Sequence, residues 1–384
     1  MLEKEPRCPV YKKCGGCQLD VTYPQQLSYK MRTVIGLLGR FGHVEPIVGM
    51  DDPLRYRCKV SRAFGFAHGR IVSGVWQSSS DKLTSIDCCA LEDEQATAIV
   101  ATLCRLAEQY KVRTYDQRTG KGCLRFVTVR VGKQTGEILV ALGVGREKCP
   151  ALKDLAAALV ACHPSVKTVV ASVSTDRRNL VLGETVTVLY GDGHITDRLC
   201  GLDFTVSAHS FFQVNPVQTE NLYRAAVEMA ELDGTQTVID AYCGVGTIGL
   251  IASHCAKSVT AVELNGAAVK NAKENVRRNG VENVRVLNGD AGDFMQDLAA
   301  MGETVDVVFT DPPRAGCSRE FLTALTAMKP RRVVYISCNP ETQARDLRYL
   351  TGNGYRIDRI RPFDMFPFTK HIECIVSLKR RGAE

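Results

Sequence analysis

The sequence predicts an α/β fold, in which a doubly wound, mainly parallel-sheet (Rossmann-like) domain follows an antiparallel α+β domain. From about residue 216 onward, short apolar runs alternate with helical stretches, a pattern typical of a parallel sheet with helices on both faces. Four of these runs are TVIDAY (237–242), SVTAVE (258–263), DVVFTD (306–311) and RVVYIS (332–337). Upstream, LRFVTVRVGKQTGEILVALG (124–143) alternates around a glycine-containing turn, which predicts a β-hairpin.

Changes of pattern divide the chain into regions. Residues 1–90 carry several cysteines and few periodic segments, with one helix expected within PQQLSYKMRTVIGLLGRFG (24–42). Residues 91–200 begin with a helical stretch and continue with alternating strands. We therefore expect residues 1–200 to combine a cysteine module (about 1–90) with an antiparallel α+β part (about 91–200), followed by the parallel-sheet domain at 201–384.

Composition limits the function classes. With 384 residues and 45% hydrophobic content, the chain can form two or three compact domains. It has no run of 18 apolar residues, and its beginning, MLEKEPRCPV, lacks the apolar core of a signal peptide. A cytoplasmic protein with no membrane contact and no obligatory protein partner is therefore expected, and its 16 cysteines should be thiols, metal ligands or nucleophiles.

The net charge of +7 is modest, but its distribution is uneven. Basic and aromatic residues interleave in RYRCKVSRAFGFAHGR (55–70) and KVRTYDQRTGKGCLRFVTVR (111–130). Such segments can grip RNA phosphates and bases, or they can form an ordinary solvated sheet face. Charge alone does not decide between these two interpretations.

The first strand of the parallel half leads into DAYCGVGTIG (240–249), whose glycines allow a tight turn and close approach to a ligand. Acids stand at four successive strand ends: Asp240, Glu263, Asp290 and Asp311. This much negative charge suits a cationic ligand that carries ribose, such as S-adenosylmethionine, better than the pyrophosphate of NAD. Each acid alone could instead be a helix N-cap.

The segment DPPRAG (311–316) has Asp and Arg where methyltransferases of exocyclic amines often have Asn and an aromatic residue, which disfavours an amine target. Methylation of a pyrimidine at C5 needs a thiolate that adds at C6 and a base that removes the C5 proton. Cys338 ends the next strand, and Glu373 lies in an apolar setting that should raise its proton affinity. Cys243 and Cys317 are rival nucleophiles, and a lone strand-end cysteine is more often inert.

Three segments, DPPRAG, VVYISCNPET (333–342) and FDMFPFTKHIE (363–373), together resemble the C-terminal signatures of the RNA uracil-5-methyltransferase family. SFFQVNP (210–216), DAYCGVGTIGL and the cysteine-rich beginning of the chain extend the resemblance upstream, so that it covers almost the whole chain. It implies that Cys338 is the nucleophile and Glu373 the base. It also implies that Gln213, Tyr242, Glu263 and Asp311 line the site for S-adenosylmethionine and the target base, with Asp290 as a further cofactor contact.

Cysteines at the beginning of the chain have the spacing of metal ligands. CPVYKKCGGC contains Cys8, Cys14 and Cys17, and SIDCCALED (85–93) offers Cys88 or Cys89 as a fourth ligand. Four thiolates can hold an iron-sulfur cluster or zinc. The resemblance implies a [4Fe-4S] cluster with Cys89 as the fourth ligand, because Ile86, Cys89 and Leu91 reproduce the family pattern.

The same resemblance indicates the substrate. Family members with this cysteine set usually modify ribosomal RNA, so 23S ribosomal RNA is expected and tRNA is the alternative. Only seven residues precede Cys8, so the chain resembles the type without the N-terminal β-barrel domain. Two other interpretations are a non-catalytic RNA-binding assembly factor, which intact Cys338 and Glu373 disfavour, and a cytosine C5 methyltransferase, which would be expected to have a Pro-Cys turn.

Overall fold

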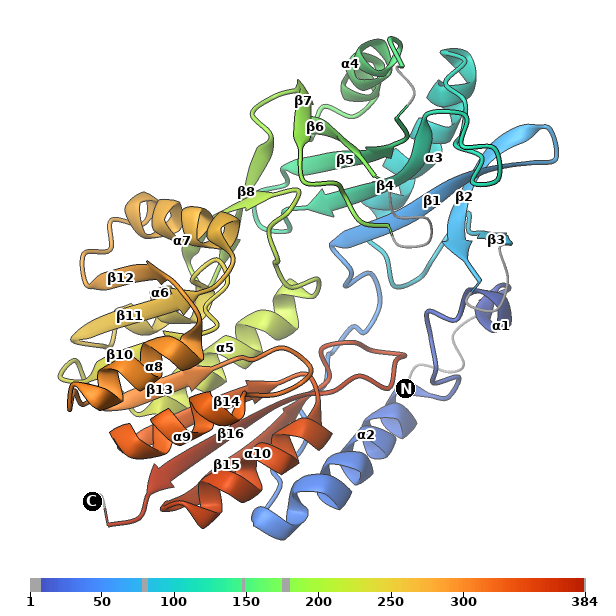
Figure 1. The fold of residues 1–384 in the computed structure, drawn as a ribbon. Helices are drawn as coiled ribbons and strands as arrows, with labels where there is room; N and C mark the ends of the chain where they lie inside the picture. The colour runs from blue at the N-terminus through green and yellow to red at the C-terminus, as the bar shows by residue number, and fades with distance from the viewer. Residues whose placement is uncertain (1–7, 78–81, 147–148, 175–179, 383–384) are drawn as a thin grey trace.

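The computed structural model describes residues 8–77, 82–146, 149–174 and 180–382 and has the expected α/β architecture. Figure 1 shows two main sheets, one formed by the N-terminal and middle parts of the chain and the other by its C-terminal half. Helix α2 (Tyr23–Leu38) comes early in the chain but lies beside the C-terminal sheet, against α10 (Pro340–Gly352). The first segments of the chain therefore help to build the C-terminal half.

The C-terminal sheet has the strand order β12-β11-β10-β13-β14-β16-β15. Its strands are β10 (Thr237–Ala241), β11 (Ser258–Glu263), β12 (Val284–Asn288), β13 (Val307–Thr310), β14 (Arg332–Ser337), β15 (Tyr355–Phe363) and β16 (Glu373–Arg380). β10 to β14 pair in parallel, as predicted, whereas β16 is antiparallel to both β14 and β15. The order reverses between β10 and β13, and this reversal marks the usual place of a ligand in such sheets.

Helices cover both faces of this sheet. One face is covered by α5 (Pro216–Ala230), α6 (Thr247–Ser253) and α7 (Gly266–Arg278), and the other by α2, α8 (Ala291–Ala300), α9 (Arg319–Met328) and α10. Local sequence signals fix some helix starts, since Asn215 and Asn339 each cap a helix that has proline as its first residue. The two resulting cores sandwich the sheet and hold its strand ends in place.

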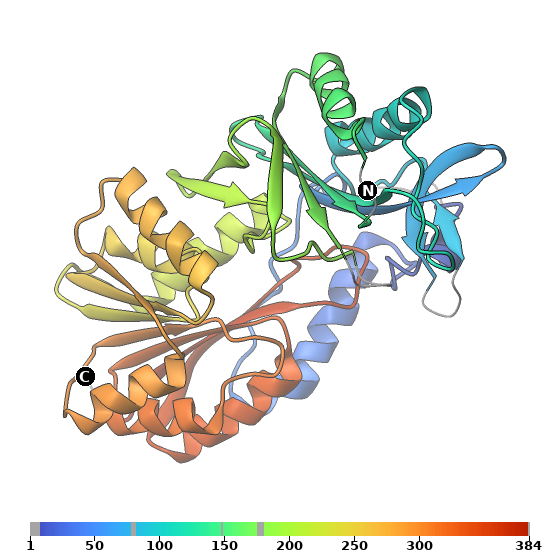
Figure 2. The same ribbon diagram turned by 45° about the horizontal axis from the view of Figure 1, so that its top comes forward.

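The N-terminal sheet has the order β3-β2-β1-β4-β5-β6-β7. Its strands are β1 (Lys59–Ala67), β2 (Arg70–Trp76), β3 (Leu83–Ser85), β4 (Leu124–Val131), β5 (Ile138–Val144), β6 (Val166–Val173) and β7 (Val186–Tyr190). Helices α3 (Glu94–Gln109) and α4 (Leu152–Cys162) cover the face turned away from the C-terminal half (Figures 1 and 2). Two short helical pieces, α1 (Tyr11–Cys14) and η1 (Gly39–Phe41), flank α2 in the chain.

The predicted hairpin is confirmed, because β4 and β5 pair in an antiparallel way around the turn at 132–137. β5 and β6, however, pair in parallel, because α4 connects them and returns the chain to the same end of the sheet. Strands from both sides of residue 90 share this sheet. The division of the chain at about residues 90 and 200 stays a prediction.

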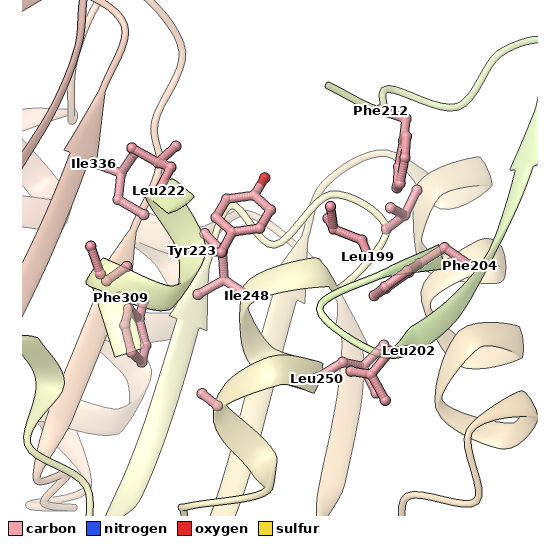
Figure 3. Close-up of a cluster of buried hydrophobic side chains, with 14 of the residues drawn as sticks. Leu199, Leu202, Phe204, Phe212, Leu222, Tyr223, Ile248, Leu250, Phe309 and Ile336 are labelled. Atoms are coloured by element: carbon pink, nitrogen blue, oxygen red, sulfur yellow. The ribbon is translucent and has the colours of Figure 1, made fainter. Parts of the chain in front are cut away.

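A small antiparallel pair, β8 (His194–Leu199) and β9 (Leu202–Ser207), connects the two halves. Its apolar side chains join the core over α5 and α6, and Figure 3 shows Leu199, Leu202 and Phe204 there beside Ile248 and Leu250. Leu139 and Val170 of the N-terminal sheet belong to the same core. One continuous apolar core therefore joins the two sheets.

Candidate active site

One edge of the C-terminal sheet gathers the predicted site residues. β10, β11, β13 and β14 end at this edge, and β16 begins there because it runs in the opposite direction. Ligands of open α/β sheets bind at this carboxyl edge. The antiparallel direction of β16 therefore places its first residue, Glu373, among strand-end residues.

The turn after β10 is shaped for close contact with a ligand. Tyr242 has φ 62°, in the left-handed region that side chains other than glycine rarely adopt, and Gly246 follows with φ 83°. Glu263 fastens this turn, because its Oε2 accepts a hydrogen bond from the Gly244 N–H at 3.0 Å. The Tyr242 ring packs against Phe321 with 5.4 Å between ring centroids. These contacts hold the tyrosine at the edge of the sheet.

A cavity of about 530 Å³ lies at this edge. All five residues predicted to bind the cofactor line it: Gln213, Tyr242, Glu263, Asp290 and Asp311. The volume is in the range of small-molecule sites. Three carboxyl groups, a phenol and an amide suit a ligand with ribose hydroxyls and a positive charge, so the residues present fit S-adenosylmethionine.

Two of the four strand-end acids, Asp290 and Asp240, differ from each other in their surroundings. Asp290 does cap α8, accepting hydrogen bonds from Gly292 N at 2.7 Å and Asp293 N at 3.2 Å, while it also lines the cavity. Asp240 is fully buried beneath the turn and accepts a hydrogen bond from Gly249 N at 2.8 Å. Burial raises its pKa to about 7. Asp240 therefore supports the turn and does not line the cavity.

The loop that carries Gln213 is held by the N-terminal sheet. Cys58, next to β1, donates through its backbone N–H to Val214 O at 2.9 Å and through its thiol to Gln213 O at 3.6 Å. Arg130 of β4 donates to Ser210 O in the same loop. The N-terminal half thus helps to position the loop that lines the cavity, although its own sheet does not line it.

Cys338 and Glu373 are neighbours at this edge. The ladder of β14 and β16 ends with Ser337 opposite Cys374, so Cys338 follows the last paired residue of β14 and Glu373 precedes the last paired residue of β16. The charge of Glu373 acts on the Cys338 thiol, so the two groups lie near each other. Cys338 is half-buried, whereas Glu373 is only 4% exposed. Two residues that are distant in sequence therefore lie together at this edge of the sheet.

Burial and neighbouring charges set the protonation of this pair. Burial raises the pKa of Glu373 well above its usual range, Asp311 raises it further, and Arg314 opposes the rise. Burial also raises the pKa of the Cys338 thiol to about 11, with further contributions from Glu373 and Asp311 and an opposing one from Arg314. The raised proton affinity expected for Glu373 from its apolar neighbours is confirmed.

Arg314 is a residue of this site that sequence reasoning missed, although it stands within DPPRAG. Its backbone oxygen accepts hydrogen bonds at 3.1 Å from the side chains of both Asn339 and Thr342, next to Cys338. The loop that follows β13 is therefore tied to the start of α10. Other missed residues line the cavity, among them His209, Phe211 and Asn271. His209 directly precedes SFFQVNP and Phe211 lies within it, so this motif was the signal for both.

The rival nucleophiles are less accessible. Cys317 is 5% exposed and Cys243 is 6% exposed. Burial raises the pKa of Cys317 to about 12 and also raises that of Cys243. Reactive thiols need access and thiolate character, so these two environments favour Cys338.

The pKa of Cys338 predicts its chemical reactivity in the free protein. Below pH 11 the thiolate fraction rises about tenfold per pH unit, so alkylation of Cys338 by iodoacetamide should rise steeply between pH 7 and 9. Replacing Asp311 with asparagine removes a like charge and should increase the rate at a given pH, whereas Arg314→Met should decrease it. Mass spectrometry of the peptide that contains Cys338 measures each rate, and identical pH profiles in all three proteins would contradict this account.

The two basic segments form β1 and β4, neighbours in the middle of the N-terminal sheet. Arg62 is 1% exposed and pairs with Glu92, while Arg130 is 6% exposed. The basic residues of these segments that are exposed lie outside the two strand centres: Arg70, Lys111, Arg113, Arg118 and Lys121. The interleaved arginines at the strand centres are therefore buried and do not form the open RNA surface considered from the sequence.

The predicted cysteine ligands share one neighbourhood. The pKa of Cys17 is raised to about 11, first by burial; Arg57 lowers it, and Cys89, Cys14 and Cys8 add to the rise. Within the described ranges, no group of three or more His, Cys, Asp or Glu side chains is placed to hold a metal ion. Cysteine thiols are suitable metal ligands, but within the described residues these thiols are not spaced to coordinate one metal ion together.

Among the described residues, none of the helices combines the length and the apolar character that a membrane span requires.

Comparisons with known proteins agree with this geometry. The family model described as tRNA (uracil-5-)-methyltransferase matches residues 194–381. An uncharacterized RNA methyltransferase of Halalkalibacterium halodurans is 42% identical over 98% of this chain and 84% of its own length. Another, of Oceanobacillus iheyensis, is 40% identical over 97% of this chain and 83% of its own length.

A solved structure is similar over most of the chain. The Pyrococcus abyssi tRNA (uracil-54, C5)-methyltransferase, in complex with S-adenosyl-L-homocysteine, is 28% identical, with a TM-score of 0.78. The match covers 94% of this chain and 84% of that one. These likenesses, with the cavity at the switch point of the sheet, identify an S-adenosylmethionine-dependent enzyme with an RNA substrate. The chain belongs to the RNA (uracil-5-)-methyltransferase family.

Proposed function

We propose that this enzyme methylates uridine at C5 with Cys338 as the nucleophile and Glu373 as the general base. The observation that carries the proposal is the pairing of β14 and β16, whose ladder ends one residue before Cys338 and one residue after Glu373. Asp311 and Arg314 lie close enough to both for their charges to alter both proton affinities. Both residues are thus near Asp311, which lines the cofactor cavity, and this position supports their proposed roles as nucleophile and base.

The chemistry follows from these two groups. The Cys338 thiolate adds to C6 of uracil, which makes C5 a nucleophile, and S-adenosylmethionine supplies the methyl group that C5 accepts. The Glu373 carboxylate then removes the C5 proton, and the electron pair re-forms the C5–C6 double bond as the C6–S bond breaks. The thiolate is regenerated, and Glu373 later returns its proton to solvent.

The remaining cavity residues bind and orient. Glu263, already fixed by the Gly244 N–H, presents its carboxylate for ribose hydroxyls. The carboxyl groups of Asp290 and Asp311 and the side chains of Gln213 and Tyr242 complete the lining. A buried target base also requires that the uridine leave its stack, as in other enzymes that modify bases.

We further propose 23S ribosomal RNA as the substrate, on the strength of the cysteine set at positions 8, 14, 17 and 89. The second candidate is tRNA, which the name of the similar Pyrococcus abyssi enzyme favours. Mapping 5-methyluridine in ribosomal and transfer RNA from a strain that lacks this protein separates the two. Loss at a 23S position supports the first candidate, loss only in tRNA replaces it with the second, and no loss in either RNA overturns both.

For the cysteine module we propose a [4Fe-4S] cluster held by Cys8, Cys14, Cys17 and Cys89. Its support is the common neighbourhood of the four thiols, since the charges of Cys89, Cys14 and Cys8 all act on Cys17. Arg57 lies close enough to Cys17 and Cys89 for their charges to interact, so a guanidinium is available beside the anionic sulfurs. Zinc on the same four thiolates is the alternative.

An anaerobically prepared protein should contain about four iron and four sulfide ions per chain. Cys17→Ser and Cys89→Ser should each lower the iron content, whereas Cys88→Ser should leave it unchanged because the family pattern of Ile86, Cys89 and Leu91 assigns the fourth ligand to Cys89. Elemental analysis and visible absorption measure both. A colourless protein with about one zinc ion would replace the iron-sulfur cluster with a zinc site.

A further inference from the structure

The segment 364–372, which joins β15 to β16, leads directly into Glu373 and has no regular secondary structure. Its backbone includes Phe368 with φ 66°, a left-handed conformation that is costly for a phenylalanine. Such a conformation persists only where neighbouring groups maintain it. The position of Glu373 therefore depends on what holds this segment.

Gln26 of α2 holds the strained residue itself. Its side chain is fully buried, and its Oε1 accepts a hydrogen bond from Phe368 N at 2.7 Å. Its Nε2 donates to Val21 O at 3.0 Å, which fixes the orientation of the amide group. The carbonyl of Phe368 accepts from Gln18 N at 2.9 Å and Leu19 N at 3.1 Å. Both the backbone N–H and the backbone carbonyl of Phe368 are thus hydrogen-bonded to the N-terminal region.

Lys30, one turn further along α2, holds the beginning of the segment. Lys30 and Asp364 form an ion pair in which both side chains are fully buried. The Lys30 ammonium also donates to Phe366 O at 3.0 Å. A buried pair of this kind fixes geometry, because either charge alone would be costly in the interior.

Other contacts hold the segment from the side of the N-terminal sheet and α5. Tyr56 donates to Pro367 O at 3.1 Å, and Asn215 donates to Met365 O at 2.9 Å. Gln26 differs from these in binding the residue with the strained backbone. It lies 342 positions before Phe368 in the chain, and it is not among the residues that line the cavity.

We infer that Gln26 and Lys30 are positioning residues, which hold the segment 364–372 so that Glu373 reaches the C5 proton. The inference rests on the proposed function, because it concerns the step that Glu373 performs. Nucleophilic addition by Cys338 and methyl transfer do not require this carboxylate, whereas elimination does. Loosening the segment should therefore slow elimination selectively.

Gln26→Ala provides the test, because it removes the contact with Phe368 without leaving a buried charge. With 5-fluorouridine RNA, which has no C5 proton, the variant should form its covalent adduct at the wild-type rate. With ordinary uridine RNA, release of the methylated product should slow by about tenfold or more, since small misplacements of reacting groups cost up to ~10²-fold. A methylated protein–RNA adduct should then accumulate and be visible on a denaturing gel.

The double variant Lys30→Met/Asp364→Leu removes both charges together, so it should also form the adduct at the wild-type rate and release the methylated product slowly. Arg32→Met is the matched control, since Arg32 is exposed on the same helix and its loss should change neither rate. The inference would be overturned if Gln26→Ala released the methylated product at the wild-type rate. It would also be overturned if adduct formation and product release slowed by the same factor. Failure of the wild-type protein to form the 5-fluorouridine adduct would instead reject the proposed function.

Discussion

Replacing Cys338 with alanine is expected to abolish both methylation of uridine RNA and the covalent adduct with 5-fluorouridine RNA. Without the thiolate, C5 of uracil has no means of becoming nucleophilic, and losses of about 10⁴-fold or more accompany removal of an essential nucleophile. Binding of S-adenosylmethionine should stay close to that of the wild type, because Cys338 does not line the cofactor cavity. Turnover with labelled S-adenosylmethionine and equilibrium binding measure the two effects separately.

Cys317→Ala is the matched control for this prediction. Cys317 is a rival thiol in the same half of the chain, but it is buried and its backbone N–H is bound to Asp346 at 2.9 Å. Most of the turnover should therefore survive its replacement. If Cys338→Ala retained turnover and Cys317→Ala lost it, the nucleophile would be Cys317.

Much of this site was predictable because it follows strand ends. Parallel strands buried on both faces give short apolar runs, and the residue after each run must lie at the same edge of the sheet. Glu263 ends β11 and Asp311 follows β13 directly, so their convergence on one cavity follows from the α/β pattern. Tyr242 directly follows β10 in the same way, but its role, like that of Gln213, came from the family resemblance.

The direction of β16 was not predictable from periodicity. A run such as ECIVSL is compatible with either strand direction, and β15, which makes the antiparallel return possible, was not predicted. Direction decides the chemistry here, because a parallel β16 would have placed Glu373 at the opposite edge of the sheet from Cys338. Sequence motifs identified the pair, and only the sheet topology explains why the two residues meet.

The contacts of the N-terminal region were beyond sequence reasoning for another reason. Lys30 and Asp364 are 334 positions apart, and each in isolation resembles an ordinary surface charge. Similarly, Arg62 and Arg130 appeared as candidates for an RNA surface, but strand pairing turned them inward. Local patterns give the type of an element, whereas the burial of a particular charge depends on which distant element covers it.

Replacing Glu373 with glutamine is expected to stop the reaction after methyl transfer. Glutamine has nearly the same shape but cannot accept the C5 proton, so the C6–S bond to Cys338 should persist and methylated RNA should stay attached to the protein. General-base removal typically slows such a step by about 10²–10⁴-fold. A denaturing gel with label transferred from S-adenosylmethionine to ordinary uridine RNA would show the adduct, and free methylated product at the wild-type rate would contradict the assignment.

The stability of the Glu373→Gln variant distinguishes this chemical effect from unfolding. Burial raises the pKa of Glu373 in the folded protein well above its ordinary value of 4.5, so the folded protein holds this proton more tightly than the unfolded chain. The free energy of unfolding contributed by Glu373 is therefore full below pH 4.5 and falls as the pH rises toward the folded pKa. Glutamine does not titrate, so the variant does not lose stability in this way as the pH rises. The variant should therefore melt at or above the wild-type temperature at neutral pH. Trapped adduct in a protein of equal or greater stability would place the defect in proton removal alone.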